Sequence, residues 1–264
     1  MSTSNYYQLQ VETYDWECED ETGEDGNFQI RIWAMDKDNF PYLLRVEDYP
    51  CKLTVELPEI SSEGIVSWSI DSVEEFYNSV RYRMRESSSL LPFSPHDFAR
   101  KRKLYYFHGA RRFPFLTLKF NTKRGMDRAV SILSHSDIYV RDIGRIRAKP
   151  QELDIPTLRK MLTELGISHT EWITCPGRHV DQGSRISTIE REFIVRYNDI
   201  KPLDPEICKN WFTSPMVVSF DIETYSPRHN AMPDRWNHNC VAYLMSLVFN
   251  RYDDPDKVRN RYVI

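Results

Sequence analysis

The stretch Pro215-Met216-Val217-Val218-Ser219-Phe220-Asp221-Ile222-Glu223-Thr224-Tyr225 is an apolar run that ends in two acidic residues one position apart. Apolar and β-branched residues between a proline and a polar loop predict a buried strand. Because side chains alternate between the two faces of a strand, Asp221 and Glu223 are expected on one face, while Ile222 points into the core. The stretch therefore predicts two neighbouring carboxylates at the end of a buried strand.

Two carboxylates on one face of a strand repel each other unless a cation lies between them. Hard oxygen ligands suit Mg²⁺ or Mn²⁺, and two such ions roughly 3.5–4 Å apart are a common arrangement for in-line attack on a phosphodiester. The spacing alone is not specific. The same pattern occurs in polar surroundings, where we expect solvated faces or loops, at Glu17/Glu19, Glu19/Glu21, Asp36/Asp38 and Glu190/Glu192. The residues alone leave open a two-metal nuclease site and a plain strand terminus.

The residues Phe220-Asp221-Ile222-Glu223-Thr224 resemble the first exonuclease motif of family B DNA polymerases. Three stretches near the start of the chain, 28–35, 42–46 and 53–58, resemble the opening β segment of that family. The likeness is strongest to the delta-type polymerases and to those of large DNA viruses of eukaryotes. The resemblance implies a DNA-directed DNA polymerase that acts in DNA replication. It also implies a 3′–5′ proofreading exonuclease, whose first strand lies on an RNase H-like sheet.

The resemblance further implies that Asp221 and Glu223 are catalytic metal ligands in a site for two Mg²⁺ ions. Asp221 would bridge the ions, and Glu223 would hold the one that activates water. The implied partners are primer-template and single-stranded DNA and deoxynucleoside triphosphates, with a sliding clamp as a further candidate. The family's later exonuclease aspartates and its polymerase domain have no counterpart between Glu223 and Ile264. We therefore expect an N-terminal fragment that is inactive by itself.

The composition favours a folded intracellular protein. Hydrophobic residues make up 41% of the 264 positions, and no uninterrupted apolar stretch is long enough to span a bilayer. Residues 1–10 are polar and lack a secretory signal pattern. The five cysteines are scattered and form no C-x-x-C pair, which fits a reduced compartment. We expect no membrane partner, and we expect a nuclear location for a cellular protein, or the host nucleus or a cytoplasmic viral factory for a viral one.

Positive charge is concentrated in one part of the chain. Residues 100–149 carry 14 basic and 3 acidic groups, a net charge of +11, although the whole chain has a net charge of −4. Such a segment is typical of contact with a polyanion, and cations beside aromatic rings suit single-stranded nucleic acid. The candidate nucleic-acid-binding residues are Arg100, Lys101, Arg102, Lys103, Arg111, Arg112, Lys123 and Arg124. The alternative is a solvated face that neutralises the acidic residues 1–99.

The hydrophobic periodicity around the basic segment alternates between strand and helix patterns. The expected order is a strand at 52–57, a helix at 71–85 capped by Asp71, strands at 103–107 and 113–120, a helix at 123–133 and a strand at 137–141. This is a β-α-β-β-α-β order, which predicts a ferredoxin-like unit. A further helix is expected from Asp154 to about Gly166, with Asp154 at its cap and Pro156 in its first turn.

The expected fold class is α+β. We expect an OB-like N-terminal β segment at 1–50, the basic ferredoxin-like unit at 51–150, a helix and β connector at 151–212, and the opening strands of an RNase H-like exonuclease domain at 213–264. Two alternative functions stay open from the sequence. One is a stand-alone single-stranded nucleic-acid-binding protein, and the other is a module that only docks other replication proteins.

Overall fold

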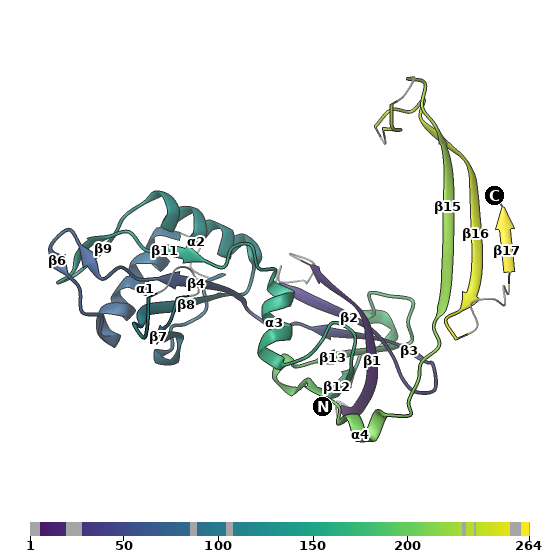
Figure 1. Ribbon diagram of the computed structural model, residues 1–264, viewed down its shortest axis with the longest axis horizontal. Coiled ribbons are helices and arrows are strands. Elements are labelled where there is room, and N and C mark those ends of the chain that lie inside the picture. Colours follow the sequence, from purple (N-terminus) through teal and green to yellow (C-terminus); the bar gives the residue numbers. More distant parts are fainter. Residues whose placement is uncertain are drawn as a thin grey trace.

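The computed structural model describes residues 6–19, 28–84, 89–103, 108–228, 231–234, 236–253 and 260–263. Its architecture is mixed α+β, with more strands than helices, which confirms the predicted fold class. Two packed units lie side by side, and a three-stranded sheet projects from the second of them (Figure 1). In the described part of the chain, no helix is long and apolar enough to cross a membrane.

The first unit is a closed barrel with one additional short strand. Its strands are β1 (Tyr6–Glu19), β2 (Gln29–Met35), β3 (Pro41–Val46), β12 (Trp172–His179), β13 (Arg191–Val195) and β14 (Lys201–Pro202). They pair in the order β1-β2-β3-β13-β12-β14, and β1 also pairs with β12, which closes the first five strands into a ring. The β3–β13 pair is parallel and the other pairs are antiparallel.

The length and bend of β1 make the closure possible. The N-terminal half of β1 pairs with β12, from Tyr6 to Glu12, and its C-terminal half pairs with β2. The β1–β2 register shifts between Thr13 and Asp15, and such a bulge bends a strand and increases its twist. Alternate apolar side chains of the barrel strands then fill the interior: Leu9, Val11, Ile30, Ile32, Leu44, Val46, Ile173, Cys175 and Val195.

The second unit is inserted between β3 and the later barrel strands. Its sheet has the order β11-β4-β8-β7, from β4 (Cys51–Glu56), β7 (Phe98–Lys101), β8 (Phe113–Phe120) and β11 (Lys149–Gln151). Two helices belong to this unit, α1 (Ile70–Met84) and α2 (Lys123–His135). The buried residues of the sheet and helices form one apolar core: Leu53, Val55, Phe76, Val80, Leu116, Leu118, Phe120, Ala129 and Leu133.

The helix starts differ in part from the prediction. Asp71 lies inside α1, and the first turn is closed by Ser69 and Ser72, whose hydroxyls each accept a hydrogen bond from the other's backbone N–H. A serine hydroxyl near the helix start accepts a hydrogen bond from a free N–H just as an aspartate carboxylate does, so serine serves as the cap here in place of Asp71. The helix expected from Asp154 is α3 (Thr157–Leu165), and its N-cap is Pro156 and not Asp154, because a residue that precedes proline is disfavoured in helical backbone. The helix ends before Gly166, which has φ 67°.

Within the described residues, two strands predicted for this unit are not found in its main sheet. The strand expected at 137–141 exists as β9 (Ile138–Val140), but it pairs with β10 (Gly144–Ile146) in a separate hairpin, and β11 occupies the sheet edge. Positive φ at Asp142 (61°) and Gly144 (88°) turns the chain back directly after β9, and β9 pairs with the strand that returns, β10. The strand expected at 103–107 lies almost entirely outside the described residues, and β7 pairs with β8 in the sheet.

The remaining short elements lie within the two units or just before the projecting sheet. They are the hairpin β5 (Ile60–Ser61) and β6 (Gly64–Ile65), the 3-10 turns η2 (Pro95–Asp97), η3 (Gln182–Ser184) and η4 (Tyr197–Asp199), and α4 (Pro205–Cys208). The predicted four-part division of the chain stays a prediction. Strands from 6–46 and 172–202 share one sheet, which places the expected first segment and part of the third in the same barrel.

A buried carboxylate joins the two halves of the barrel sequence. Glu192 on β13 is 0% exposed, which corrects the expectation of a solvated face at this position. It accepts hydrogen bonds from Arg45 Nη1 (3.1 Å), from the backbone N–H groups of Ile186 and Ser187 (3.2 and 3.3 Å), and from Ser187 Oγ (3.0 Å). These donors replace the water that the carboxylate loses on burial.

We expect Arg45→Met to lower the free energy of unfolding by about 3–5 kcal/mol, because it leaves a buried charge without its counterion. Urea denaturation measures this loss, and the double variant Arg45→Met/Glu192→Met should recover most of it. Arg147→Met is the matched control, since Arg147 forms an exposed pair with Asp137 at 3.0 Å that contributes at most about 1 kcal/mol. Equal losses in Arg45→Met and the control would contradict the prediction.

Candidate metal centre

The acidic motif lies on the projecting sheet. This sheet consists of β15 (Met216–Tyr225), β16 (Val241–Arg251) and β17 (Asn260–Val263), paired antiparallel in the order β15-β16-β17. The strand predicted over the motif is therefore present, and two further strands follow it. Within the described residues these strands pair only with one another.

Regular alternation along β15 puts Asp221 and Glu223 on the same face of the strand, as predicted. Their cross-strand partners on β16 are Ser246 and Leu244. The register then shifts directly after Glu223, because Tyr243 has no partner on β15, and a bulge at this point changes the local twist of the strand. Both carboxylates are exposed, and neither side chain forms a hydrogen bond or ion pair with a described residue.

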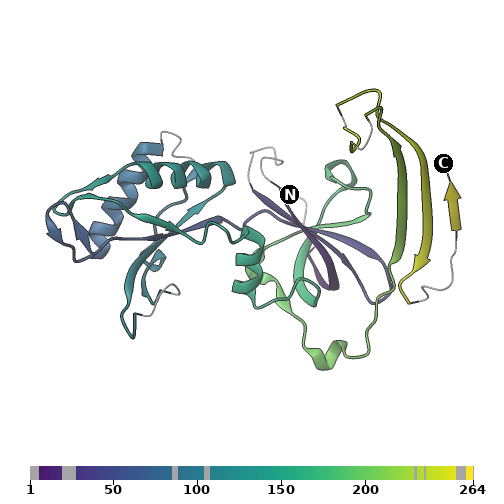
Figure 2. The same ribbon diagram turned by 45° about the horizontal axis from the view of Figure 1, so that its top comes forward.

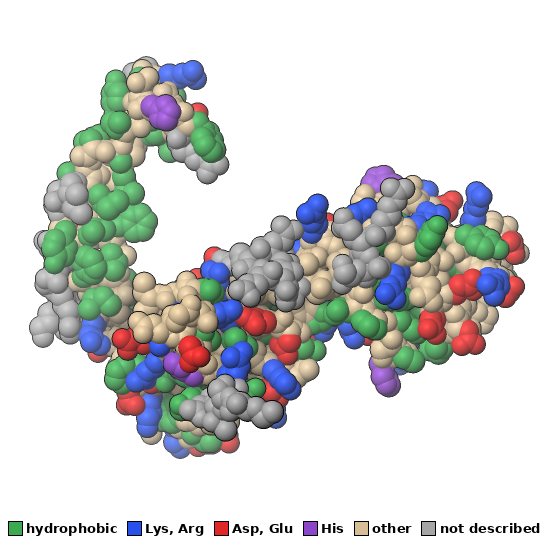
Figure 3. Space-filling view, turned by 180° about the vertical axis from the view of Figure 1, so that it is seen from behind, with side chains coloured by type: hydrophobic (Ala, Val, Ile, Leu, Met, Phe, Trp, Pro, Cys, Tyr) green, Lys and Arg blue, Asp and Glu red, His purple; other side chains and the backbone are tan. Residues whose placement is uncertain are grey.

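The predicted burial of this strand is wrong. Ile222 is 38% exposed, and Phe220 on the same face is exposed as well. On the opposite face Asp221, Glu223 and Tyr225 are exposed too, so neither face of β15 is covered. The physical reason is that no described element packs against the three-stranded sheet, so its apolar side chains have nothing to pack on. Figure 3 shows these side chains gathered along the projecting hairpin.

The donor chemistry of the pair fits Mg²⁺, because both groups offer hard carboxylate oxygens. Two carboxylates provide fewer ligands than such a cation coordinates. Among the described residues, no group of three or more His, Cys, Asp or Glu side chains could hold a metal ion. Asp221 and Glu223 therefore fit as part of a coordination shell for a hard cation, and they do not complete one by themselves.

Three of the predicted basic residues are paired with acidic ones. Glu59 pairs with Arg100 (3.9 Å) and Arg111 (2.5 Å), and Glu56 pairs with Lys103. The Lys103 ammonium also lies 3.9 Å from the centre of the Phe113 ring. These contacts hold the residues on either side of the β7–β8 connection. They also neutralise part of the positive charge that was expected to bind nucleic acid.

The other five predicted cations fall into two separate groups. Lys101, Arg102 and Arg112 lie near the β7–β8 connection, are exposed, and have no side-chain partner among the described residues. Lys123 and Arg124 begin α2, beyond the opposite end of β8. The eight residues of β8 span about 26 Å at the usual rise of a strand. The structure therefore does not bring all eight predicted residues to one place.

No protein-family model matches the chain. Among curated proteins, DNA polymerase 120R of Invertebrate iridescent virus 3 is 24% identical over 269 residues, a match that covers 95% of this chain and 22% of that protein. Among solved structures, the family B DNA polymerase from the hyperthermophilic archaeon Pyrobaculum calidifontis matches with a TM-score of 0.58 and 11% identity, over 97% of this chain and 26% of that one.

The structural match defines the class of fold, since nearly the whole chain superposes on part of a family B DNA polymerase. The viral relative adds a match in sequence over almost the same extent. Together they confirm the resemblance to the N-terminal region of family B DNA polymerases that the motifs indicated. The chain spans about a fifth of the length of the viral relative and about a quarter of the archaeal one.

We expect Mn²⁺ to bind this chain only in the millimolar range, because two carboxylates without a third described ligand hold a hard cation weakly. Paramagnetic broadening of amide NMR signals should centre on Asp221 and Glu223. Asp221→Asn should remove the broadening, whereas Glu17→Gln, in an acidic pair elsewhere, should leave it unchanged. Binding in the micromolar range, or broadening that persists in Asp221→Asn, would contradict the prediction.

Proposed function

We propose that this chain is the N-terminal region of a family B DNA-directed DNA polymerase with a 3′–5′ proofreading exonuclease, which acts in DNA replication. The observation that carries the proposal is the presence of the Asp-x-Glu strand in a chain that matches such polymerases over nearly its whole length. The viral relative favours a polymerase of the large-DNA-virus type. The proposed site of action is inside the host cell, in the nucleus or a cytoplasmic viral factory.

For the exonuclease we propose Asp221 and Glu223 as ligands of Mg²⁺. When bound, the metal supplies Lewis-acid activation of water and neutralises charge that develops on the phosphate. The chain's own contribution is to hold two carboxylates on one face of a strand, fixed by the β15–β16 ladder from Met216 to Tyr225. Because both side chains are exposed, a phosphodiester can approach that face of the strand directly.

We propose finer assignments for the two packed units as well. The barrel is OB-like, which the closed ring of five strands, the parallel β3–β13 pair and the helix α3 before β12 support. The second unit is ferredoxin-like, which the strand order β11-β4-β8-β7 and the two intervening helices support. Both are modules that commonly accompany nucleic-acid contact.

For the parent enzyme we propose primer-template DNA and deoxynucleoside triphosphates as partners, with a sliding clamp as a further partner. Within this chain we propose that Lys101, Arg102 and Arg112, which have no side-chain partner among the described residues, contact the phosphate backbone of single-stranded DNA. Three charges that no described acidic side chain neutralises are available for phosphates, whereas Arg100, Lys103 and Arg111 must first give up their glutamates.

In the complete polymerase, Asp221→Ala should reduce 3′–5′ excision of single-stranded DNA while polymerisation is retained. The loss should exceed the roughly 10–100-fold that removal of an outer-shell partner of a metal typically costs, because a direct ligand is lost. Timed digestion of a 3′-labelled oligonucleotide measures excision, and primer extension measures polymerisation. Undiminished excision in Asp221→Ala would refute the ligand assignment.

The triple variant Lys101→Gln/Arg102→Gln/Arg112→Gln should weaken the binding of this chain to oligothymidine. Each lost phosphate contact should flatten the plot of log K against log salt concentration by about 0.7, a total of about 2. Fluorescence anisotropy at several salt concentrations measures the slope. The matched triple variant Arg100→Gln/Lys103→Gln/Arg111→Gln should change the slope less, and equal changes would speak against the division into paired and available cations.

A further inference from the structure

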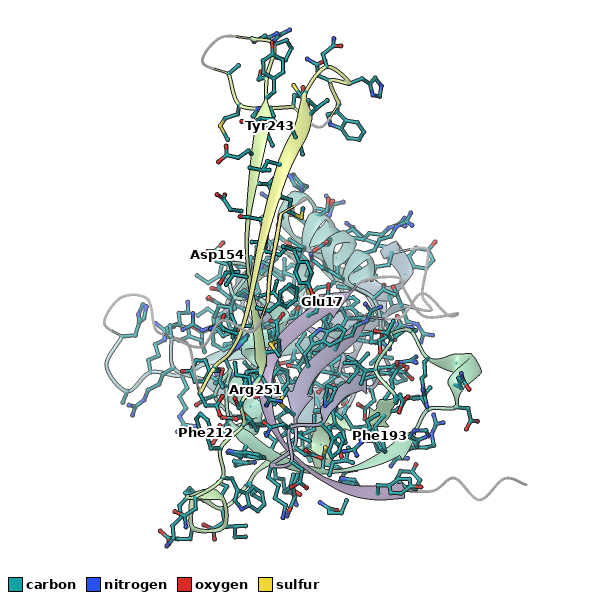
Figure 4. The ribbon with its side chains drawn as sticks, turned by 90° about the vertical axis from the view of Figure 1, so that its right-hand side faces the viewer. Glu17, Asp154, Phe193, Phe212, Tyr243 and Arg251 are labelled. Atoms are coloured by element: carbon teal, nitrogen blue, oxygen red, sulfur yellow. The ribbon has the colours of Figure 1, made fainter. Side chains whose placement is uncertain are left out.

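The projecting sheet is attached to the barrel through the residues that immediately precede β15. Figures 1 and 2 show the sheet standing away from both packed units and joined to the barrel at its base. In Figure 4, Arg251 and Phe212 lie at that base, while Tyr243 lies toward the far end of the hairpin. The direction in which β15 leaves the barrel is therefore decided by contacts at the base.

Two polar residues at this base are buried. Thr213 is 2% exposed and Ser214 is 6% exposed, although both belong to a connecting segment. The Thr213 hydroxyl donates to Glu12 Oε2 and is also in hydrogen-bond contact with the Tyr14 hydroxyl. The Tyr14 hydroxyl in turn donates to Glu12 Oε2 at 3.2 Å. Both barrel residues lie on β1, so Thr213 is held by the strand that closes the barrel.

Ser214 is held from two sides. Its backbone N–H donates to Asn39 Oδ1 at 2.6 Å, and Asn39 lies in the β2–β3 turn with φ 66°. On the hairpin side, the Ser214 hydroxyl donates to Asp253, and its carbonyl accepts from Arg251 Nη1 at 3.3 Å. Ser214 thus connects the barrel with the end of β16, and not only with the start of β15.

Burial, followed by the nearby charge of Glu12, raises the pKa of the Tyr14 hydroxyl. Tyr14 therefore keeps its proton at neutral pH and can donate to Glu12 or to Thr213. Aromatic contacts support the same segment, since the Trp211 ring meets Trp172 of β12 at a centroid distance of 5.1 Å and an interplanar angle of 75°. The polar contacts hold Thr213 and Ser214 against the barrel, and the contact between the two tryptophan rings holds Trp211 there as well.

The length of β15 makes the geometry of its base important for the acidic pair. Asp221 lies seven residues beyond Ser214, which is about 23 Å along an extended chain. A rotation of about 10° at Ser214 would therefore displace the Asp221 carboxylate by about 4 Å. Catalytic groups tolerate displacements of only about 0.5 Å. A loosely attached strand could not present its carboxylates reproducibly.

We propose that Glu12, Tyr14, Asn39, Thr213 and Ser214 form a clasp that sets the direction of β15 relative to the barrel, and that Tyr14 and Thr213 are positioning residues for Asp221 and Glu223. The orienting role rests on the contacts of these five residues. Its consequence for excision rests in addition on the proposed exonuclease function.

The orienting role is tested on this chain by ¹⁵N relaxation of backbone amides. In the unmodified chain, amides of β15 should have order parameters like those of the barrel, about 0.85. Thr213→Val and Tyr14→Phe each delete one hydroxyl and keep the side-chain shape, and the β15 values should fall below about 0.6. Thr213→Ser keeps the hydroxyl and should restore the original values. Thr224→Val, on the same strand but outside the clasp, is the matched control.

Order parameters of β15 that stay at the barrel value in both Thr213→Val and Tyr14→Phe would overturn the proposal. Values below about 0.6 in the unmodified chain would overturn it too, because the strand would then have no fixed direction. Loss of the barrel's own amide signals in both variants would also overturn it, since these hydroxyls would then serve barrel stability.

The same substitutions in the complete polymerase separate this proposal from the assignment of the metal ligands. Thr213→Val should lower kcat for 3′–5′ excision by about 10- to 100-fold with KM and polymerisation unchanged, and Thr213→Ser should restore it. If β15 loosens in Thr213→Val and excision keeps its full rate, the clasp stands and the catalytic assignment of Asp221 and Glu223 fails. If β15 stays rigid while Asp221→Ala abolishes excision, the clasp fails and the ligand assignment stands.

Discussion

The pairing of β1 with both β2 and β12 is the constraint on which the other parts of the molecule depend. The β1–β12 pairing joins residues 160 to 172 positions apart, so the whole four-stranded unit has to leave the barrel after β3 and return before β12. Closing such a long loop costs only slightly more entropy than closing a short one, because the cost rises with the logarithm of length. The apolar interior offsets that cost, and the inserted unit folds around a core of its own.

Barrel closure also explains where polar groups are buried. The parallel β3–β13 pair brings Arg45 beside Glu192, and the same closure places β1 beside the segment that leads to β15. A buried carboxylate is tolerated at Glu192 because its donors come from several segments at once. The clasp at Thr213 uses the same principle, since its hydroxyl contacts two residues of one barrel strand. In both places polar groups that lose water on burial form hydrogen bonds between segments, across the β3–β13 pair at Glu192 and between β1 and the segment before β15 at Thr213.

The local elements could be predicted from sequence because they depend on periodicity and on turn chemistry, both of which lie within a few residues. The strand over 216–225 and the helix that ends at Gly166 are examples. The partners of these elements could not be predicted. Nothing local in 172–195 indicates that these residues complete a barrel with 6–46. Likewise, Glu190 and Glu192 look alike in the sequence, and only strand pairing buries one of them.

The candidate site shows the same division between local pattern and spatial partner. The alternation that puts Asp221 and Glu223 on one face is local and was predicted, whereas the burial of Ile222 requires a covering layer and was not found. The basic residues differ for a related reason: Glu56 and Glu59, which neutralise Arg100, Lys103 and Arg111, precede the basic segment in sequence and reach it only through the β4–β8–β7 sheet. Net charge counted along a segment therefore overstates the charge available to a ligand, because folding pairs some of its cations with acids that the count leaves out.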